Sequence, residues 1–179
     1  MKNTYIIILL VTSLGFYACE EEDPCEANQQ LCLQEQYDAD VLKIEEFIAA
    51  KNLEPTKHES GLQYFANNPG ESDSATRGQF VSVDYVGKLL DGTVFDTSID
   101  SIARVAGIYN ENRTYQPFSF QLGSGSVIAG WDIGLPFFEE GGYGYLIIPS
   151  YLGYGSRTTA SIPPNTVLYF EINLIDVKY

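Results

Sequence analysis

The feature that most constrains the fold is a run of alternating residues, Phe80–Leu89, that ends in a tight turn. Val81, Val83 and Tyr85 fall on one face of this run, as expected for a strand with one buried face. The Asp91-Gly92 pair that follows is a strong turn signal. The run therefore predicts an antiparallel strand whose inward face carries an aromatic residue.

Other short runs of the same kind predict a sheet around one short helix. The last run, Leu168–Val177, alternates in the same way and is expected to be a long closing strand. A short helix is expected over Val127–Leu135, and Pro136 helps to end it. The expected strands are Leu62–Phe65, Phe80–Leu89, Phe118–Leu122, Tyr145–Ile148 and Leu168–Val177. This order predicts an α+β fold, an antiparallel β half-barrel that wraps a short α-helix, preceded by an N-terminal helical arm.

Composition narrows the class of function. The chain has 179 residues and a formal net charge of -14 at pH 7, which argues against nucleic acid as a partner because such proteins need a basic face. The acidic excess lies mostly in residues 19–60. His58 is the only histidine, and the cysteine spacing fits no zinc pattern. We therefore expect no metal site and no cofactor.

Residues 1–18 have the layout of a secretory signal. A lysine near the start precedes an apolar run, Tyr5–Val11, that is too short to span a membrane. The segment ends at Cys19 and resembles a bacterial lipoprotein signal, in which this cysteine becomes the lipidated N-terminus. The resemblance implies a lipid-anchored protein of the cell envelope, in the outer membrane, facing the periplasm or exposed at the surface. An ordinary signal followed by a free cysteine is the alternative.

An acidic tether is expected over residues 19–33. Its run Glu20–Asp23 resembles the surface-export tag of some Gram-negative bacteria, and the simpler interpretation is a solvated tether. Cys25 and Cys32 lie in the same segment, and in an oxidising compartment such a pair can close a disulfide.

An amphipathic helix and a linker are expected over residues 34–60. The helix is predicted over Gln34–Lys51, with Asn52 and Pro55 ending it. Its apolar residues fall on one face at spacings of three and four: Tyr37, Val41, Ile44, Phe47 and Ile48. Such a helix either packs on its own domain or pairs with a second copy to make a homodimer.

The remaining motifs are weak one by one but specific in their joint order and spacing. They are Val83-Asp84-Tyr85-Val86-Gly87, Leu90-Asp91-Gly92-Thr93-Val94-Phe95-Asp96-Thr97-Ser98, Pro117-Phe118-Ser119-Phe120, Gly123, Val127-Ile128-Ala129-Gly130-Trp131, Gly134-Leu135, Gly141-Gly142, Ile148-Pro149, Leu152-Gly153-Tyr154-Gly155 and Ile162-Pro163-Pro164-Asn165. Through them, residues 61–179 resemble the FKBP-type peptidyl-prolyl cis-trans isomerases. The resemblance implies an enzyme that isomerises Xaa-Pro bonds of exported proteins, with proline-containing polypeptides as partners.

The resemblance also implies a proline pocket with Trp131 as its floor. The Ile128 backbone N–H and the Tyr154 hydroxyl would bind the substrate backbone, and Asp96 would orient the polar edge beside Tyr85. The implied catalytic residues are Tyr85, Phe95, Asp96, Trp131 and Tyr154. The implied substrate-binding residues are Phe118, Val127, Ile128, Ile162 and Phe170. Such a pocket needs no nucleophile, because a twisted amide has less charge separation than a planar one and is favoured in apolar surroundings.

The chain departs from compact family members in a long segment, Thr97–Pro117, beside the pocket mouth. Arg104 and Arg113 are both candidates for the charge partner of Asp96. The long segment keeps a second hypothesis open, namely a catalytically weak peptide-binding or chaperone module anchored to the membrane. A third hypothesis is a chaperone or dimeric scaffold that uses the N-terminal arm.

Overall fold

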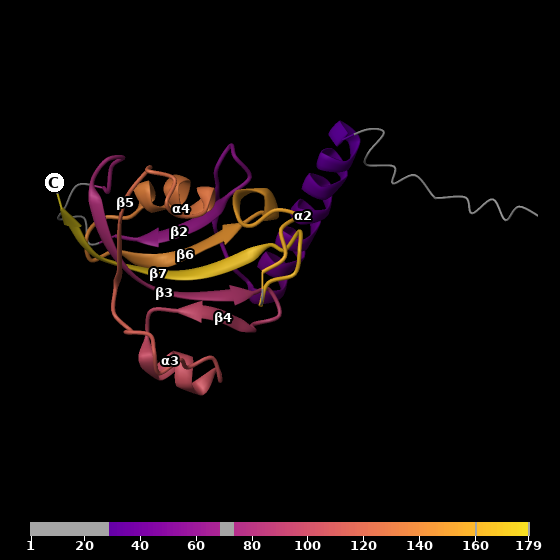
Figure 1. Cartoon of the computed structure of the whole chain (residues 1–179). Coiled ribbons are helices and arrows are strands. Elements are labelled where there is room, and N and C mark those ends of the chain that lie inside the picture. The colour runs from indigo at the N-terminus through magenta and orange to yellow at the C-terminus, as the bar shows by residue number, and fades with distance from the viewer. Residues whose placement is uncertain (1–28, 69–73, 160, 179) are drawn as a thin grey trace, which may run out of the picture.

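The computed structural model describes residues 29–68, 74–159 and 161–178, which form a long helix and one antiparallel sheet (Figure 1). The long helix is α2 (Gln29–Lys51). The strands are β1 (Thr56–Lys57), β2 (Gln63–Asn67), β3 (Phe80–Leu89), β4 (Val94–Thr97), β5 (Phe118–Gln121), β6 (Tyr143–Ile148) and β7 (Leu168–Lys178). The short helices are α3 (Asp100–Val105), α4 (Ala129–Gly134), η1 (Leu135–Phe137) and η2 (Ser150–Leu152). The predicted signal peptide, Cys19 and residues 19–28 of the predicted tether lie outside the described residues.

The sheet has the strand order β1-β2-β6-β7-β3-β4, and every described pair is antiparallel. β5 pairs with the first half of β3, while β4 pairs with its second half. Both therefore lie along the same edge of β3, and the segment between them leaves the sheet at that edge. The sheet remains open and α4 packs against it, which confirms the predicted half-barrel and short helix.

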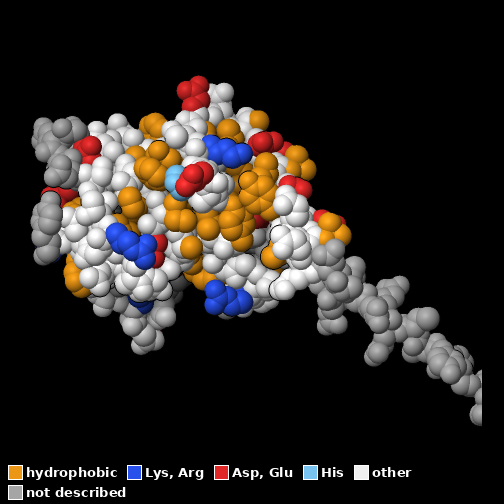
Figure 2. All heavy atoms as spheres, turned by 90° about the horizontal axis from the view of Figure 1, so that it is seen from above, with side chains coloured by type: hydrophobic (Ala, Val, Ile, Leu, Met, Phe, Trp, Pro, Cys, Tyr) orange, Lys and Arg blue, Asp and Glu red, His pale blue; other side chains and the backbone are white. Residues whose placement is uncertain are grey.

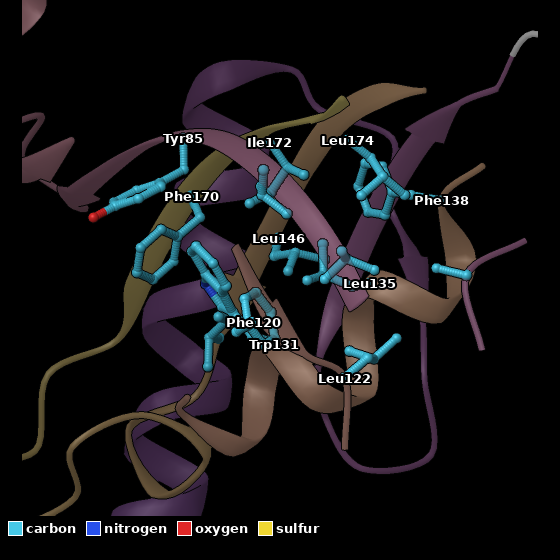
Figure 3. Packing of buried hydrophobic residues seen from close by; sticks show 14 of the residues in the cluster. Tyr85, Phe120, Leu122, Trp131, Leu135, Phe138, Leu146, Phe170, Ile172 and Leu174 are labelled. Carbon is cyan, nitrogen blue, oxygen red and sulfur yellow. The ribbon is translucent and has the colours of Figure 1, made fainter. Parts of the chain in front are cut away.

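The alternation predicted for the two central strands is confirmed. Val81, Val83 and Tyr85 of β3 are all buried. So are the alternate residues of β7, namely Leu168, Phe170, Ile172 and Leu174. Figure 3 shows these side chains meeting those of α4 in one cluster, with the Tyr85 hydroxyl turned away from it. This arrangement leaves one polar group at the edge of an apolar core.

Two glycines bring α4 unusually close to the sheet. A Cβ atom at Gly130 would lie 2.5 Å from Ile148, and one at Gly134 would lie 2.7 Å from Leu146. The two glycines are four residues apart and so lie on the same helix face. Since neither carries a side chain, α4 rests directly on β6, and Trp131 is buried beside it.

The arm helix starts earlier than predicted, at Gln29 rather than Gln34. Residues 29–33 therefore belong to the helix and not to a tether, because the apolar periodicity used for the prediction begins only at Tyr37. Ile44 is buried against Ile147 and Val167, so the arm packs on its own domain. A homodimer through this helix stays a prediction.

The cysteine on the arm helix forms a disulfide. Cys32 is disulfide-bonded, and Cys25, its predicted partner, lies outside the described residues.

Across residues 29–68, 74–159 and 161–178, no helix is both long enough and apolar enough to cross a membrane.

The linker after the arm is partly ordered by aromatic contacts. It contains the two-residue strand β1, which was not predicted. Hydrophobic side chains gather around His58 on the face shown in Figure 2. The His58 ring centroid lies 5.6 Å from that of Phe137, which in turn stacks on Tyr64 at 4.0 Å. This histidine thus packs the linker onto the domain.

The segment between β4 and β5 contains a helix, α3, that was not predicted. It projects from the β4 edge of the sheet, on the side away from α4 (Figure 1). With six residues it is too short to show a helical period in the sequence. No strand was predicted for β4, since four residues next to an Asp-Gly turn carry little alternation.

Candidate active site

A cavity of about 420 Å³ opens between the sheet and α4. Nine of the ten residues predicted for the pocket line it, namely Tyr85, Phe95, Asp96, Phe118, Val127, Ile128, Trp131, Tyr154 and Phe170. They come from β3, β4, β5, the turn before α4, α4 itself, the loop after η2 and β7, and they lie up to 85 residues apart in the sequence. A larger hollow of about 730 Å³ lies elsewhere, between the first half of α2 and the loop around Tyr151.

Ile162 is the predicted residue that does not line the cavity. Its side chain is only 4% exposed and belongs to the core cluster. Its backbone exchanges hydrogen bonds with Thr159, from Ile162 N–H to Thr159 Oγ1 at 3.1 Å and from Thr159 N–H to the Ile162 carbonyl at 3.2 Å. These bonds fold the loop back on itself and turn Ile162 into the core, where it supports the pocket from behind.

The cavity floor is built from aromatic rings in edge-to-face contact. Trp131 lies at 5.1 Å from Tyr85 and at 5.3 Å from Phe170, with interplanar angles of 79° and 83°. Phe95 meets Phe170 in the same way, at 5.5 Å and 88°. Edge-to-face pairs are favoured because the positive ring edge meets the negative ring face. The rings therefore hold one another in place and form a rigid apolar surface.

Gly87 makes room for two of these rings. A Cβ atom at this position would lie 2.7 Å from Phe95 Cζ and 2.8 Å from Phe170 Cε1. Gly87 is also the cross-strand partner of Phe170. The missing side chain lets the Phe95 and Phe170 rings approach β3 closely, and both rings line the cavity.

One corner of the cavity is polar. The Tyr85 hydroxyl donates to Asp96 Oδ2 at 2.6 Å and accepts from Arg113 Nη2 at 3.0 Å. Arg113 Nη1 also forms an ion pair with Asp96 Oδ1, to which the Thr97 N–H donates at 2.8 Å. Arg113 is therefore the charge partner of Asp96. The other candidate, Arg104, pairs with Asp100.

The surroundings of this corner set its protonation. Burial raises the pKa of Tyr85 well above its ordinary value, and the hydrogen bond to Asp96 and its charge raise it further. Burial lowers the pKa of Arg113, but its hydrogen bonds and its attraction to Asp96 and Tyr85 outweigh this and leave it raised. Burial, with the charge of Asp96, also raises the pKa of Tyr154. At neutral pH the corner thus holds two neutral phenols and one guanidinium.

The Ile128 N–H and the Tyr154 hydroxyl belong to residues that line the cavity, and neither has a partner among the described residues. Ile128 precedes α4 in an extended conformation (φ -61°, ψ 146°); its carbonyl accepts from the Trp131 N–H at 2.9 Å, while its own N–H makes no hydrogen bond with residues 29–68, 74–159 or 161–178. The Tyr154 hydroxyl has no hydrogen bond with those residues either. Both are placed to receive acceptors from a bound chain.

Arg113 and Ser126 line the cavity but were not assigned to it from the sequence. Arg113 was a candidate partner for Asp96, and only the folded path of the long segment shows which arginine reaches the site. Ser126 lies in the Gly-Ser turn before α4 and accepts a hydrogen bond from Ser124 at 2.9 Å. Nothing in its local sequence distinguishes it from an ordinary turn residue.

Stacked side chains hold the long segment that delivers Arg113. Tyr109 and Tyr115 stack at 5.4 Å, and the Asn110 N–H donates to the Tyr115 hydroxyl at 3.0 Å. The guanidinium carbon of Arg104 lies 3.6 Å from the Tyr109 ring centroid, and that of Arg113 lies 5.2 Å from the Tyr115 ring centroid. The segment is therefore an ordered extension of the pocket wall.

Comparison with known proteins agrees with this geometry. Residues 71–175 match the family model described as FKBP-type peptidyl-prolyl cis-trans isomerase. The chain belongs to this family. In the described residues of this FKBP-type chain, no group of three or more His, Cys, Asp or Glu side chains is placed to hold a metal ion.

Among relatives, FK506-binding protein 4 of Neurospora crassa is 38% identical over 131 residues, which cover 72% of this chain and 25% of that protein. The chain spans about a quarter of the length of the curated relatives it matches. Two solved structures match more fully. FkpA from Escherichia coli has a TM-score of 0.61 and 30% identity, covering 84% of this chain and 64% of that one. A peptidyl-prolyl cis-trans isomerase from Pseudomonas syringae has a TM-score of 0.59 and 30% identity, covering 79% of this chain and 96% of that one.

Proposed function

We propose that the chain is a peptidyl-prolyl cis-trans isomerase that acts on Xaa-Pro bonds of exported proteins. The observation that carries the proposal is the cavity of about 420 Å³, walled by aromatic rings with a single polar corner. A proline ring is compact and apolar, so it fits such a space. The two free donors beside it match the carbonyl groups that flank a proline in a polypeptide.

The cavity acts on the amide by favouring its twisted form. Rotation of a peptide bond faces a barrier of about 18–20 kcal/mol because resonance must be broken. The twisted amide has less charge separation than the planar one, so a dry apolar surface stabilises it relative to the ground state. The Ile128 N–H and the Tyr154 hydroxyl hold the flanking backbone while the proline ring is fixed against Trp131.

The experiment compares Ile128→Pro with Ile128→Ala in a cis-to-trans assay on a short Xaa-Pro peptide. Proline fits here because its fixed φ of about -65° matches the observed -61°, and it removes the N–H. Alanine trims the side chain but keeps the N–H. A hydrogen bond contributes about 1 kcal/mol, so kcat/KM of the proline variant should lie about fivefold below that of the alanine variant.

Circular dichroism of both variants checks that the fold is kept. A folded wild-type chain that fails to accelerate the reaction would contradict the isomerase proposal. Equal rates in the two variants would instead remove the Ile128 N–H from the mechanism.

A peptide-binding or chaperone module is the second candidate, favoured by the long segment beside the cavity. Val105 on α3 is 92% exposed, and Tyr109, four residues later, is also exposed. This segment therefore offers apolar surface on which a polypeptide can bind. Calorimetric titration with a proline-containing peptide separates the two candidates. Micromolar binding without any acceleration of isomerisation would favour the module.

The location and the assembly of the protein are separate proposals. Residues 1–18 and Cys19 support a lipid anchor in the cell envelope, because they have the layout of a lipoprotein signal. Labelled fatty acid should enter the wild-type chain and not Cys19→Ser. Leu42 is exposed on α2 and supports a homodimer through the arm. Sedimentation equilibrium of wild type and Leu42→Glu tests that assembly.

A further inference from the structure

Asp40, on the arm helix, is a fully buried acidic residue (0% exposed). In the sequence it lies 45 residues before Tyr85, the first residue that lines the cavity. Its Oδ2 accepts the Ser150 N–H at 2.7 Å, and its Oδ1 accepts from Gln36 Nε2 at 2.8 Å. A buried carboxylate is costly unless its oxygens are hydrogen-bonded, and here both are. The first of these bonds joins α2 to the start of η2.

The backbone of Ser150 connects Asp40 with the segment that carries Tyr154. The Ser150 carbonyl accepts the N–H groups of Gly153 and Gly155 at 3.0 and 2.8 Å. These two residues flank Tyr154, whose half-buried side chain packs on the core and lines the cavity. Ser150 is therefore held by the arm through its N–H and holds both neighbours of Tyr154 through its carbonyl.

A second contact joins the arm to the same loop. The Tyr37 ring of α2 lies 5.8 Å from that of Tyr151, the residue after Ser150. The Tyr151 hydroxyl donates to the Ser60 carbonyl at 2.5 Å. The loop before Tyr154 thus has fixed points on the arm and on the linker, whereas the sheet contacts of the arm are made further along, around Ile44.

We propose that Asp40 is a positioning residue of the active site, and that it holds the Tyr154 hydroxyl at the cavity through Ser150. The inference rests on the proposed isomerase function for its kinetic consequence. By this proposal the arm helix helps to position an active-site side chain. Asp40 itself touches neither the cavity nor any group that the cavity would bind.

The kinetic test is a double-mutant cycle in the full-length chain, with Asp40→Ala, Tyr154→Phe and the combined variant. Removing one hydrogen bond to the substrate should lower kcat/KM about threefold to tenfold in Tyr154→Phe. Asp40→Ala should produce a loss of similar size in the wild type and almost none in the Tyr154→Phe background. Losses that multiply, or an unchanged rate in Asp40→Ala, would overturn the proposal.

Two further variants guard against a general loss of stability. Asp40→Asn keeps an oxygen acceptor for the Ser150 N–H, so it should restore most of the rate. Ile48→Ala weakens the packing of the same helix on the sheet without touching Ser150. It should lower the unfolding temperature and leave kcat/KM within about twofold of wild type, since surface packing of the arm contributes no donor to the site.

An NMR measurement that does not depend on enzymatic activity separates this inference from the proposed function. With ¹³C-labelled tyrosine, the Tyr154 ring signal is assigned by its loss in Tyr154→Phe. The signal should shift in Asp40→Ala and stay in place in Ile48→Ala. An inactive wild type with this shift would refute the isomerase and support the positioning role, whereas an unmoved signal would refute the positioning role even in an active enzyme.

Discussion

The substitution Gly87→Ala tests whether the aromatic walls of the cavity bind the substrate. The added methyl would lie 2.7 Å from Phe95 Cζ and 2.8 Å from Phe170 Cε1, whereas carbon atoms in contact are about 3.5–4.0 Å apart. Both contacts must therefore lengthen by about 1 Å, through movement of the rings or of the strand. Phe170 is buried between Trp131 and Phe95, so Phe95, which is half-buried beside the cavity, is the ring with room to move.

We expect two measurable effects of this retreat. Overpacking of this kind costs about 1–3 kcal/mol of unfolding free energy, which urea denaturation measures. The displaced Phe95 ring also narrows the cavity of about 420 Å³, so kcat/KM for an Xaa-Pro peptide should fall about tenfold, equivalent to about 1.4 kcal/mol. The fall should appear mainly in KM, because the proline ring loses space.

Gly142→Ala is the matched control. A Cβ atom there would lie 2.5 Å from Asn68 Oδ1 and 2.8 Å from the Glu139 carbonyl, so the same methyl is overpacked away from the cavity lining. It should destabilise the fold and leave the rate nearly unchanged. If Gly87→Ala is destabilised and yet keeps wild-type kcat/KM, the reasoning that makes Phe95 a wall of the proline site is refuted.

Three further predictions concern the polar corner. Arg113→Ala removes a half-exposed ion pair with Asp96 and a hydrogen bond to Tyr85. It should lower kcat/KM about fivefold, equivalent to about 1 kcal/mol. A rate equal to that of wild type would show that the ion pair has no catalytic effect. Tyr115→Leu removes the ring stacked on Tyr109 and lying beside Arg113, and should produce a loss no larger than that of Arg113→Ala and none in an Arg113→Ala background. The pKa of Tyr85 is raised above the value of 10.0 expected in the unfolded chain, so the stability it contributes is complete below pH 10 and decreases above it. Unfolding free energy should therefore fall more steeply above pH 10 in wild type than in Tyr85→Phe, by up to about 1.4 kcal/mol per pH unit, and equal slopes would contradict the raised pKa.

Much of the sheet and the site could be predicted because their signals are local. The alternation in β3 and β7 states which side chains face inward, and a one-residue shift would expose all of them. The joint spacing of the motifs placed Tyr85, Phe95, Asp96, Trp131 and Tyr154 in one pocket, and all five line the cavity. The helix α4 was expected within Val127–Leu135, where Pro136 helps to end it.

The parts that escaped prediction depend on contacts between distant segments. Nothing near Arg113 shows that it reaches Asp96 while Arg104 does not, since the choice depends on the folded path that the Tyr109–Tyr115 stack fixes. Ile162 was placed at the pocket rim, but two backbone bonds with Thr159 turn it inward. The bond from Ser150 to Asp40 spans 110 residues and has no local signature at either end.

The way β4 and β5 share one edge of β3 has a consequence for how this protein can vary. β4 ends at Thr97 opposite Val86, and β5 begins at Phe118 opposite Val83, so both ends of the intervening segment are fixed three residues apart on one strand. A segment fixed in this way can double in length at a cost of only about 0.6 kcal/mol in loop-closure entropy. Whole segments can therefore be exchanged at this point without shifting the register of any strand, provided that the replacement again brings a cation to Asp96. The junction can therefore carry a different segment beside the cavity while the sheet stays the same.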